Sequence, residues 1–187
     1  MHETSMADAE YPRSRDLIDR YPRYVTGRDM SPWETTVWAF LQEFVLPLAL
    51  PEEGCVLELG TARGINFSRL ADHYGLERCV GFDVANYGNH PRVREIDVRT
   101  LGREDDFPLA LAWNDLSDWE QSPRSKAAGL KFAARNLVPG GYYMDACLTE
   151  SARRWIRRLP ASLVVERDSI ALFDCAESSV LGGDSHE

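Results

Sequence analysis

The stretch that most constrains the fold is residues 55–64, which read CVLELGTARG. A short apolar run leads through Glu58 to Gly60, and a second glycine, Gly64, precedes an apolar-periodic segment over residues 65–74. This order predicts a buried strand, a tight glycine turn and a helix. Glycine suits a sharp turn that a ligand approaches closely, and the helix start offers that ligand unpaired N–H groups. The spacing differs from the dinucleotide pattern G-x-G-x-x-G, so a plain strand-to-helix turn without a ligand is the alternative.

A second short apolar run, residues 79–83, also ends in an acid, Asp83. Asp83 falls about 20 residues beyond the glycine turn, where nucleotide-binding α/β folds keep a carboxylate for ribose hydroxyls. Glu58 stands near the end of the first predicted strand, and open α/β sheets bind ligands beyond the carboxyl ends of their strands. Two strands that end in acids around a glycine-turned helix therefore predict a site for a ribose-bearing ligand.

The ordered segments VLELGTARG, VGFDV and NLVPGGYYMDA resemble the class I S-adenosylmethionine-dependent methyltransferases, in particular the small-molecule O-methyltransferase branch with an E-x-G-x-x-x-G first motif. The resemblance covers residues 55–175. It implies an α/β, Rossmann-like fold, in which a mostly parallel seven-stranded twisted sheet has helices on both faces and a C-terminal antiparallel edge hairpin. It also implies S-adenosylmethionine as cofactor and methyl transfer to a small-molecule acceptor, foremost a hydroxyl oxygen, with secondary metabolism as the expected setting.

The same resemblance implies roles for the residues around the glycine turn. Glu58 would act near the ammonium of the cofactor's methionine part, and Asp83 would receive both ribose hydroxyls. Asp97 would contact adenine, because an ionised carboxylate only accepts hydrogen bonds and so suits an exocyclic amine; capping of the next turn is its alternative role. The predicted cofactor-binding residues are Glu58, Gly60, Thr61, Ala62, Gly64, Asp83, Val84, Asp97, Val98 and Asn114.

The end of the fourth predicted strand, residues 108–113, indicates where the acceptor would bind. In the resembled family this strand end faces the methyl group, which makes Asp115 the foremost catalytic candidate, with turn capping as the alternative. His90, on a short link over residues 85–92, is the candidate general base. His73 lies late in the first helix and is expected at the surface.

A magnesium site is a further expectation from the resemblance. Asp115 and Asp145 are its candidate ligands. Asp115 follows the fourth predicted strand and Asp145 lies in the fifth, and metal-dependent members of the family place acids at the ends of these two strands. Those members usually carry a second polar residue after the second acid, whereas Asp145 is followed by Ala146. Hard cations bind several oxygens, so water and substrate would have to supply the remaining ligands.

The remainder of the chain divides around this unit. Residues 1–12 are predicted to be a disordered leader, 13–50 a helical segment that covers the cofactor, 51–176 the cofactor-binding domain and 177–187 a flexible tail. Ser31, Pro32 and Glu34 predict a helix start, and this helix is expected to run to about residue 46. Trp33 and Trp38 are expected to pack against the sheet, with a place in the substrate pocket as the alternative.

Composition disfavours several classes of protein. The 187 residues carry a net charge of −9, which disfavours a nucleic-acid partner. The four cysteines form no C-x-x-C pair, which disfavours zinc and redox sites, and no apolar run approaches the length of a membrane span. We expect a cytoplasmic protein with a small-molecule acceptor and no membrane partner, and a homodimer through the N-terminal helices is left open.

Two other functions are left open by the sequence. One is a catalytically degenerate protein of the same fold that binds S-adenosylmethionine or acts as a scaffold, because the segments around Asn114 and Asp145 depart from the family pattern. The other is an NAD-dependent enzyme, which the missing G-x-G-x-x-G pattern disfavours. Binding of the two cofactors would separate these classes.

Overall fold

The computed structural model describes residues 32–116, 123–157 and 160–175. The predicted leader over residues 1–12 and the predicted tail over residues 177–187 lie outside these ranges, as does the first part of the predicted N-terminal segment. The domain boundaries predicted there stay predictions.

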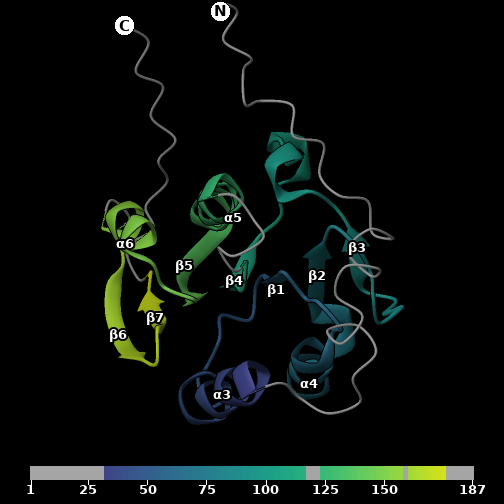
Figure 1. Ribbon diagram of the computed structural model, residues 1–187, viewed down its shortest axis with the longest axis horizontal. Coiled ribbons are helices and arrows are strands. Elements are labelled where there is room, and N and C mark those ends of the chain that lie inside the picture. The colour runs from purple at the N-terminus through teal and green to yellow at the C-terminus, as the bar shows by residue number, and fades with distance from the viewer. Residues whose placement is uncertain (1–31, 117–122, 158–159, 176–187) are drawn as a thin grey trace, which may run out of the picture.

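A single sheet organises the described residues, with the strand order β3-β2-β1-β4-β5-β7-β6 (Figure 1). The first five strands run parallel, and β7 is antiparallel to both β5 and β6 at one edge. The predicted seven-stranded α/β fold with its edge hairpin is therefore confirmed. The strands are β1 (Cys55–Leu59), β2 (Cys79–Asp83), β3 (Val93–Glu95), β4 (Leu109–Asn114), β5 (Leu137–Ala146), β6 (Ser162–Arg167) and β7 (Ile170–Asp174).

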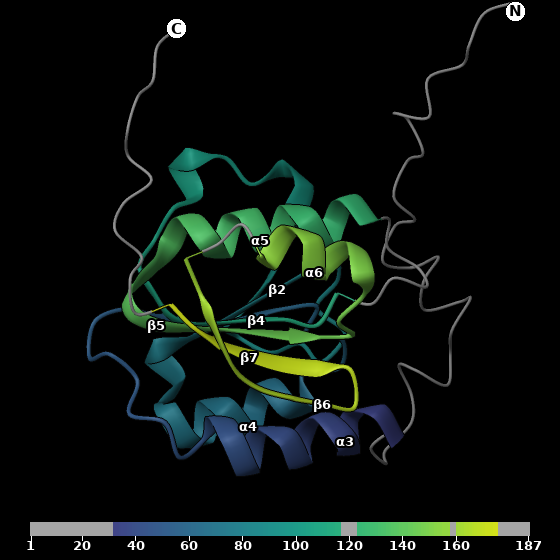
Figure 2. The same ribbon diagram turned by 90° about the vertical axis from the view of Figure 1, so that its left-hand side faces the viewer.

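Helices cover both faces of the sheet, as Figure 2 shows. One face carries α3 (Pro32–Phe40) and α4 (Ile65–Tyr74), and the other carries α5 (Pro123–Asn136) and α6 (Glu150–Ile156). The predicted helix start before α3 is confirmed at Pro32, and the helix continues as a π-helical turn over Leu41–Val45. Short 3-10 turns follow at Leu76–Arg78, Val98–Thr100 and Arg103–Asp105.

Two apolar cores result from the alternation of side chains along the strands. Leu57 and Leu59 of β1 pack into the core beneath α5 and α6. Val56 precedes Leu57, so its side chain lies on the opposite face and packs into the core beneath α3 and α4. Glu58 has the same parity as Val56, so the sheet directs its side chain toward the α3 and α4 face.

Strand boundaries differ from the predictions at three places. The third strand, expected over residues 93–98, ends at Glu95, because the Asp97 side chain accepts a bond from Arg99 N (2.9 Å) and starts a 3-10 turn. The fourth strand, expected to end at residue 113, includes Asn114. The turn expected over residues 138–141 lies within β5, where the register shifts opposite Leu109 and Leu111.

The link from β2 to β3 contains no crossover helix. The Asn86 side chain holds this link in shape: its amide donates to His90 O (2.9 Å) and Val93 O (3.2 Å) and accepts from His90 N (2.9 Å). At Gly88 an added Cβ would lie 2.5 Å from the carbonyl oxygen of Arg63. The link therefore packs directly on the glycine turn.

None of the helices in the described parts of the chain has the length and apolar character needed to cross a bilayer.

Candidate functional site

The glycine turn after β1 packs against the ends of the two neighbouring strands, β2 and β4. Gly60 and Gly64 have positive φ values of 86° and 72°, which glycine adopts without strain. Gly60 N donates to Phe82 O of β2 (2.8 Å), and an added Cβ at Gly60 would lie 3.1 Å from the carbonyl oxygen of Asp115. An added Cβ at Gly64 would meet no atom within 4 Å. The backbone is thus tightly packed at the first glycine and open at the second, where a ligand can approach.

Asp83 ties this turn to the end of β2. Its Oδ2 accepts from Ala62 N (2.7 Å) and its Oδ1 from Val84 N (2.7 Å), and only 8% of the residue is exposed. Burial raises the pKa of Asp83 to about 6, although the backbone N–H bonds oppose this shift. A carboxylate offers about four lone-pair sites, so Asp83 can accept further hydrogen bonds from a ligand.

A small crevice lies beside Asp83, at the carboxyl ends of the strands. Its walls are apolar apart from two carboxylates, Asp83 and Asp97, and it is lined by Leu59, Phe82, Asp83, Val84, Ile96, Asp97, Val98 and Leu116. Four predicted cofactor-binding residues, Asp83, Val84, Asp97 and Val98, are thereby brought together. An apolar slot with two acids in its lining suits a nucleoside.

Asp97 also has the capping role that the sequence left open. Its carboxylate accepts from Arg99 N (2.9 Å) and forms an ion pair with the Arg99 guanidinium (2.5 Å). Although partial burial raises the pKa of Asp97, the hydrogen bonds and charge of Arg99 lower it overall. Asp97 is therefore ionised near neutral pH and remains an acceptor.

Glu58 is the most deeply buried acid of the site, with 2% of the residue exposed. Burial raises its pKa well above the usual value, and the charges of Asp115, Asp83 and Glu34 raise it further. Its Oε2 has no hydrogen-bond partner among the described residues. A buried, unsatisfied carboxylate is costly, and a cationic ligand would offset this cost.

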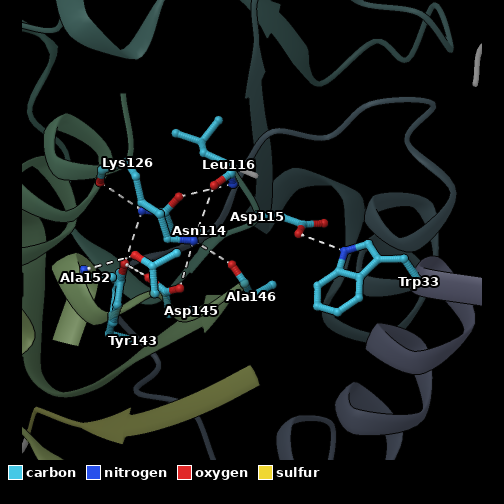
Figure 3. A network of polar contacts seen from close by, with 10 residues as sticks. Trp33, Asn114, Asp115, Leu116, Lys126, Tyr143, Asp145, Ala146 and Ala152 are labelled. Carbon is cyan, nitrogen blue, oxygen red and sulfur yellow. Dashed lines mark hydrogen bonds and ion pairs between the residues drawn. The ribbon is translucent and has the colours of Figure 1, made fainter. Parts of the chain in front are cut away.

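The start of α3 lies across the glycine turn. The Glu34 carboxylate forms an ion pair with Arg63 Nη2 (2.7 Å), and Asn66 Nδ2 donates to Glu34 O (3.3 Å). Trp33 Nε1 donates to Asp115 Oδ1 (3.4 Å), so the same helix also contacts the end of β4 (Figure 3). Polar contacts thus connect the N-terminal helix α3 to the glycine turn after β1 and to the residue that follows β4.

Asp115 follows β4 and is held by its backbone N, which donates to Leu59 O (2.9 Å). Burial raises its pKa to about 7; Trp33 and Lys126 oppose the shift, and the charges of Asp145 and Glu34 add to it. A carboxylate with a pKa near neutrality is suited to accept a proton from an acceptor group.

Replacing Asp115 by asparagine is expected to stabilise the protein at pH 8. In the unfolded chain an aspartate has a pKa of about 3.9, so the folded state with its raised pKa binds more protons, and its stability falls as pH rises from about 4 through 7. Asp115→Asn removes this loss and should add about 2 kcal/mol at pH 8 and almost nothing at pH 4. Urea denaturation at several pH values measures the difference. A difference that is the same at every pH would contradict the assignment.

Asn114 and Asp145 point to the other face of the sheet. They are register partners in β4 and β5, and Asn114 Nδ2 donates to Tyr143 Oη (3.1 Å) and to Lys126 O of α5 (3.2 Å). Asp145 is fully buried and accepts from Tyr143 Oη (2.9 Å). The Asn114 side chain therefore takes part in an internal network rather than in the crevice.

The magnesium expectation is not supported. No cluster of three His, Cys, Asp or Glu side chains that could hold a metal is found in the described residues. Asp145 is instead paired with Lys126 Nζ (2.9 Å), while Asp115 accepts from Trp33 on the α3 side. β4 ends one residue later than expected, so Asn114 and not Asp115 is the register partner of Asp145, and the two predicted ligands contact helices on different faces of the sheet.

Of the two histidines, His90 lies beside α4 and His73 lies within it. The His90 ring packs edge-on against Phe67 (4.7 Å between centroids), and its Nδ1 accepts from Arg92 N (3.3 Å). Partial burial lowers the pKa of His90. These contacts hold His90 on the β2–β3 link, while its role as a base stays a prediction. His73 is exposed, as expected, with Nε2 3.1 Å from Leu46 O.

Thr61 differs from its neighbours in the turn because its side chain is directed into the core. An added Cβ at Gly81 would lie 2.5 Å from Thr61 Cγ2 and 3.3 Å from Phe67 Cε2. The Thr61 methyl group thus packs between β2 and α4.

Three polar residues of this region were not predicted from the sequence: Arg63, Asn66 and Lys126. The first two flank Gly64 and contact Glu34, a partner that no motif indicates. For Lys126 there was a signal: Lys126, Leu130 and Ala133 are spaced i, i+4 and i+7, and the last two are buried. A lysine in the apolar stripe of a helix indicates a buried charge with a partner.

Comparison with known proteins places the fold. Neither a family model nor a curated protein sequence matches the chain. Solved structures do match: N-methyltransferase NodS from Bradyrhizobium japonicum WM9, in complex with S-adenosyl-L-homocysteine, is 16% identical with a TM-score of 0.56, and the match covers 84% of this chain and 97% of that one.

Two further solved structures with different activities are also similar to the chain. CalS11, a TDP-rhamnose 3'-O-methyltransferase in calicheamicin biosynthesis, is 18% identical with a TM-score of 0.51 over 86% of this chain and 85% of its own. The [4+2]-cyclase SpnF is 16% identical with a TM-score of 0.54 over 80% of this chain and 70% of its own. The chain therefore has the fold of S-adenosylmethionine-dependent methyltransferases, a fold that also includes a cyclase.

Proposed function

We propose that this chain binds S-adenosylmethionine and transfers its methyl group to a small-molecule acceptor, foremost at a hydroxyl oxygen. The observation that carries the proposal is the set of acids at one edge of the sheet. Glu58, Asp83 and Asp115 come from the ends of β1, β2 and β4, and Glu34 of α3 is close enough to raise the pKa values of Glu58 and Asp115.

This set of acids favours a cationic ligand. S-adenosylmethionine has a sulfonium and an ammonium, and either would offset the burial and the repulsion between acids that together raise the pKa of Glu58. NAD has a pyrophosphate, and its negative charges would add to the same repulsion. The arginine nearest the turn, Arg63, is already paired with Glu34. Charge therefore supports the sulfonium cofactor over the dinucleotide.

The residues of the crevice fit the remaining parts of this cofactor. Asp83 would accept the ribose hydroxyls, and Asp97 and Val98 would border the adenine. The unsatisfied Oε2 of Glu58 would face the methionine part, either directly or through water. Gly64 leaves open space for backbone approach. When bound, S-adenosylmethionine supplies an electrophilic methyl group.

Asp115 is the residue that supports a hydroxyl acceptor. With a pKa of about 7, its carboxylate is partly ionised at neutral pH and can take the proton that a hydroxyl loses as its oxygen is methylated. Trp33 Nε1 holds the carboxylate in place. The net charge of −9 supports a small acceptor rather than RNA, whose phosphates it would repel.

Calorimetric titration of the full-length protein tests the cofactor. We expect micromolar affinity for S-adenosylmethionine and S-adenosylhomocysteine and no heat with NAD. The neutral compound 5′-methylthioadenosine should bind more weakly, because it lacks the ammonium that Glu58 would face. Tighter binding of NAD, or equal affinity for methylthioadenosine, would contradict the proposed charge selection.

A second candidate is a protein of this fold that binds the cofactor without transferring its methyl group. The similarity to SpnF, a cyclase, favours keeping this candidate, as does the use of Asn114 and Asp145 in an internal network. Radiolabelled methyl transfer to a panel of catechols and sugars separates the two: binding without transfer to any acceptor favours the second.

A further inference from the structure

A buried ammonium lies between the ends of β4 and β5. Lys126 extends from α5 into the sheet edge with only 5% of its side chain exposed. Its Nζ is 2.9 Å from Asp145 Oδ1, 2.6 Å from Ala146 O and 3.3 Å from Leu116 O (Figure 3). The ammonium thus donates hydrogen bonds to the carbonyl oxygens of Ala146 and Leu116 and forms an ion pair with Asp145, so its oxygen partners come from two strand ends.

These oxygens are themselves held by a closed network. Tyr143 Oη donates to Asp145 Oδ2 (2.9 Å) and accepts from Asn114 Nδ2 (3.1 Å), and Asn114 Nδ2 is also 3.2 Å from Lys126 O. Lysine is almost never fully buried unless it is paired, and a buried pair is tolerated only when its remaining hydrogen bonds are satisfied. The oxygens are therefore arranged as a site for a cation.

The position of this cation connects it to the crevice. Leu116, whose carbonyl accepts a hydrogen bond from Lys126, also lines the crevice, as do Asp83 and Asp97. Asp115 lies between Leu116 and Asn114, both of which contact Lys126. Loss of the ammonium would release the Leu116 carbonyl and leave Asp145 as an unpaired buried charge.

We propose that Asp145, Ala146 O and Leu116 O form a cation site that the chain fills with its own ammonium, and that this ammonium positions the Leu116 wall of the cofactor crevice. Lys126 is then a positioning residue, and its ammonium is paired with Asp145, one of the two acids predicted to bind a metal ion. The effect on the crevice rests on the proposed function; the cation site itself does not.

Chemical rescue tests the cation site in the full-length protein. Lys126→Ala removes three methylenes and the ammonium, a fragment that propylammonium replaces. We expect Lys126→Ala to melt at a lower temperature than the wild type, and propylammonium to restore the melting temperature while propan-1-ol, its neutral analogue, does not. The control is Lys131→Ala, an exposed lysine of the same helix whose ammonium lies over Trp155; neither compound should shift its melting temperature.

Binding of S-adenosylhomocysteine tests the positioning role. We expect Lys126→Ala to lose at least about tenfold in affinity and to regain it with propylammonium. Equal rescue of the melting temperature by propan-1-ol would show that Lys126 only fills space, and no rescue by propylammonium would equally overturn the cation site.

A second variant keeps the proposal testable if Lys126→Ala does not fold. Asp145→Asn retains the shape of the side chain and the Tyr143 bond but removes the charge that holds the ammonium. It should also weaken S-adenosylhomocysteine binding; wild-type affinity in Asp145→Asn would overturn the positioning role. If the wild type itself binds no S-adenosylhomocysteine, the proposed function fails, while the melting experiment still decides the cation site.

Discussion

Replacing Asp83 by alanine should abolish measurable binding of S-adenosylmethionine. The carboxylate would accept two ribose hydroxyls, and hydrogen bonds to a charged group contribute about 1.5–3 kcal/mol each. The same carboxylate also holds Ala62 N and Val84 N, each at 2.7 Å, so the glycine turn would lose its attachment to β2. Together these losses predict a decrease in affinity of at least about 100-fold, measured by calorimetry at pH 7.5.

Asp106→Ala is the matched control for this experiment. Asp106 is also an aspartate that accepts hydrogen bonds, from Arg135 (2.7 Å) and Asn136 (3.1 Å), but it precedes β4 and so lies at the opposite end of the sheet. Its removal should leave cofactor affinity unchanged. If Asp83→Ala is folded by circular dichroism and binds like Asp106→Ala, Asp83 is not the ribose acceptor.

The second large effect is expected on stability. Lys126→Met should lower the free energy of unfolding by about 3–5 kcal/mol, because it leaves the fully buried Asp145 as an uncompensated charge. The double variant Lys126→Met/Asp145→Asn removes both charges and keeps an acceptor for Tyr143. It should recover more than half of the loss, since neutral replacement of a buried pair costs little. Urea denaturation at pH 7 measures the free energy of unfolding of the wild type, Lys126→Met and the double variant.

A surface ion pair provides the comparison. Arg153 of α6 forms an ion pair with Glu166 of β6, and about a third of each side chain is exposed. Arg153→Met should cost less than about 1 kcal/mol. If Lys126→Met cost no more than Arg153→Met, the buried pair would contribute no more than a solvent-screened one, and the network around Asp145 would have to tolerate an unpaired charge.

Several features of the fold followed directly from the sequence. Short apolar runs predict parallel strands buried on both faces, and Gly60 and Gly64 mark the turn where the backbone takes positive φ values. Because parallel strands end at the same edge of a sheet, the acids at the ends of β1 and β2 were expected together, and the hydrogen bond from Ala62 N of the glycine turn to Asp83 Oδ2 (2.7 Å) joins these two strand ends.

At the end of β4, the sequence did not determine which face of the sheet each side chain would point to. Side chains alternate along a strand, so a shift of one residue moves a side chain to the other face. The strand ends at Asn114 and not at residue 113. That single residue directs Asn114 toward α5 and Lys126 and leaves Asp115 to contact Trp33, which separates the two acids predicted to share a metal.

The order of apolar runs, glycines and terminal acids was enough to determine the class of sheet and the edge at which a ligand would bind, because hydrophobic burial and backbone sterics act locally along the chain. Only the tertiary structure decided the partners of the charges. Lys126 and Asp145 are 19 positions apart (126 to 145) and Glu34 and Arg63 are 29 apart, and no local rule specifies such pairs. Their attraction depends on distance and burial, which exist only once helices and sheet have packed.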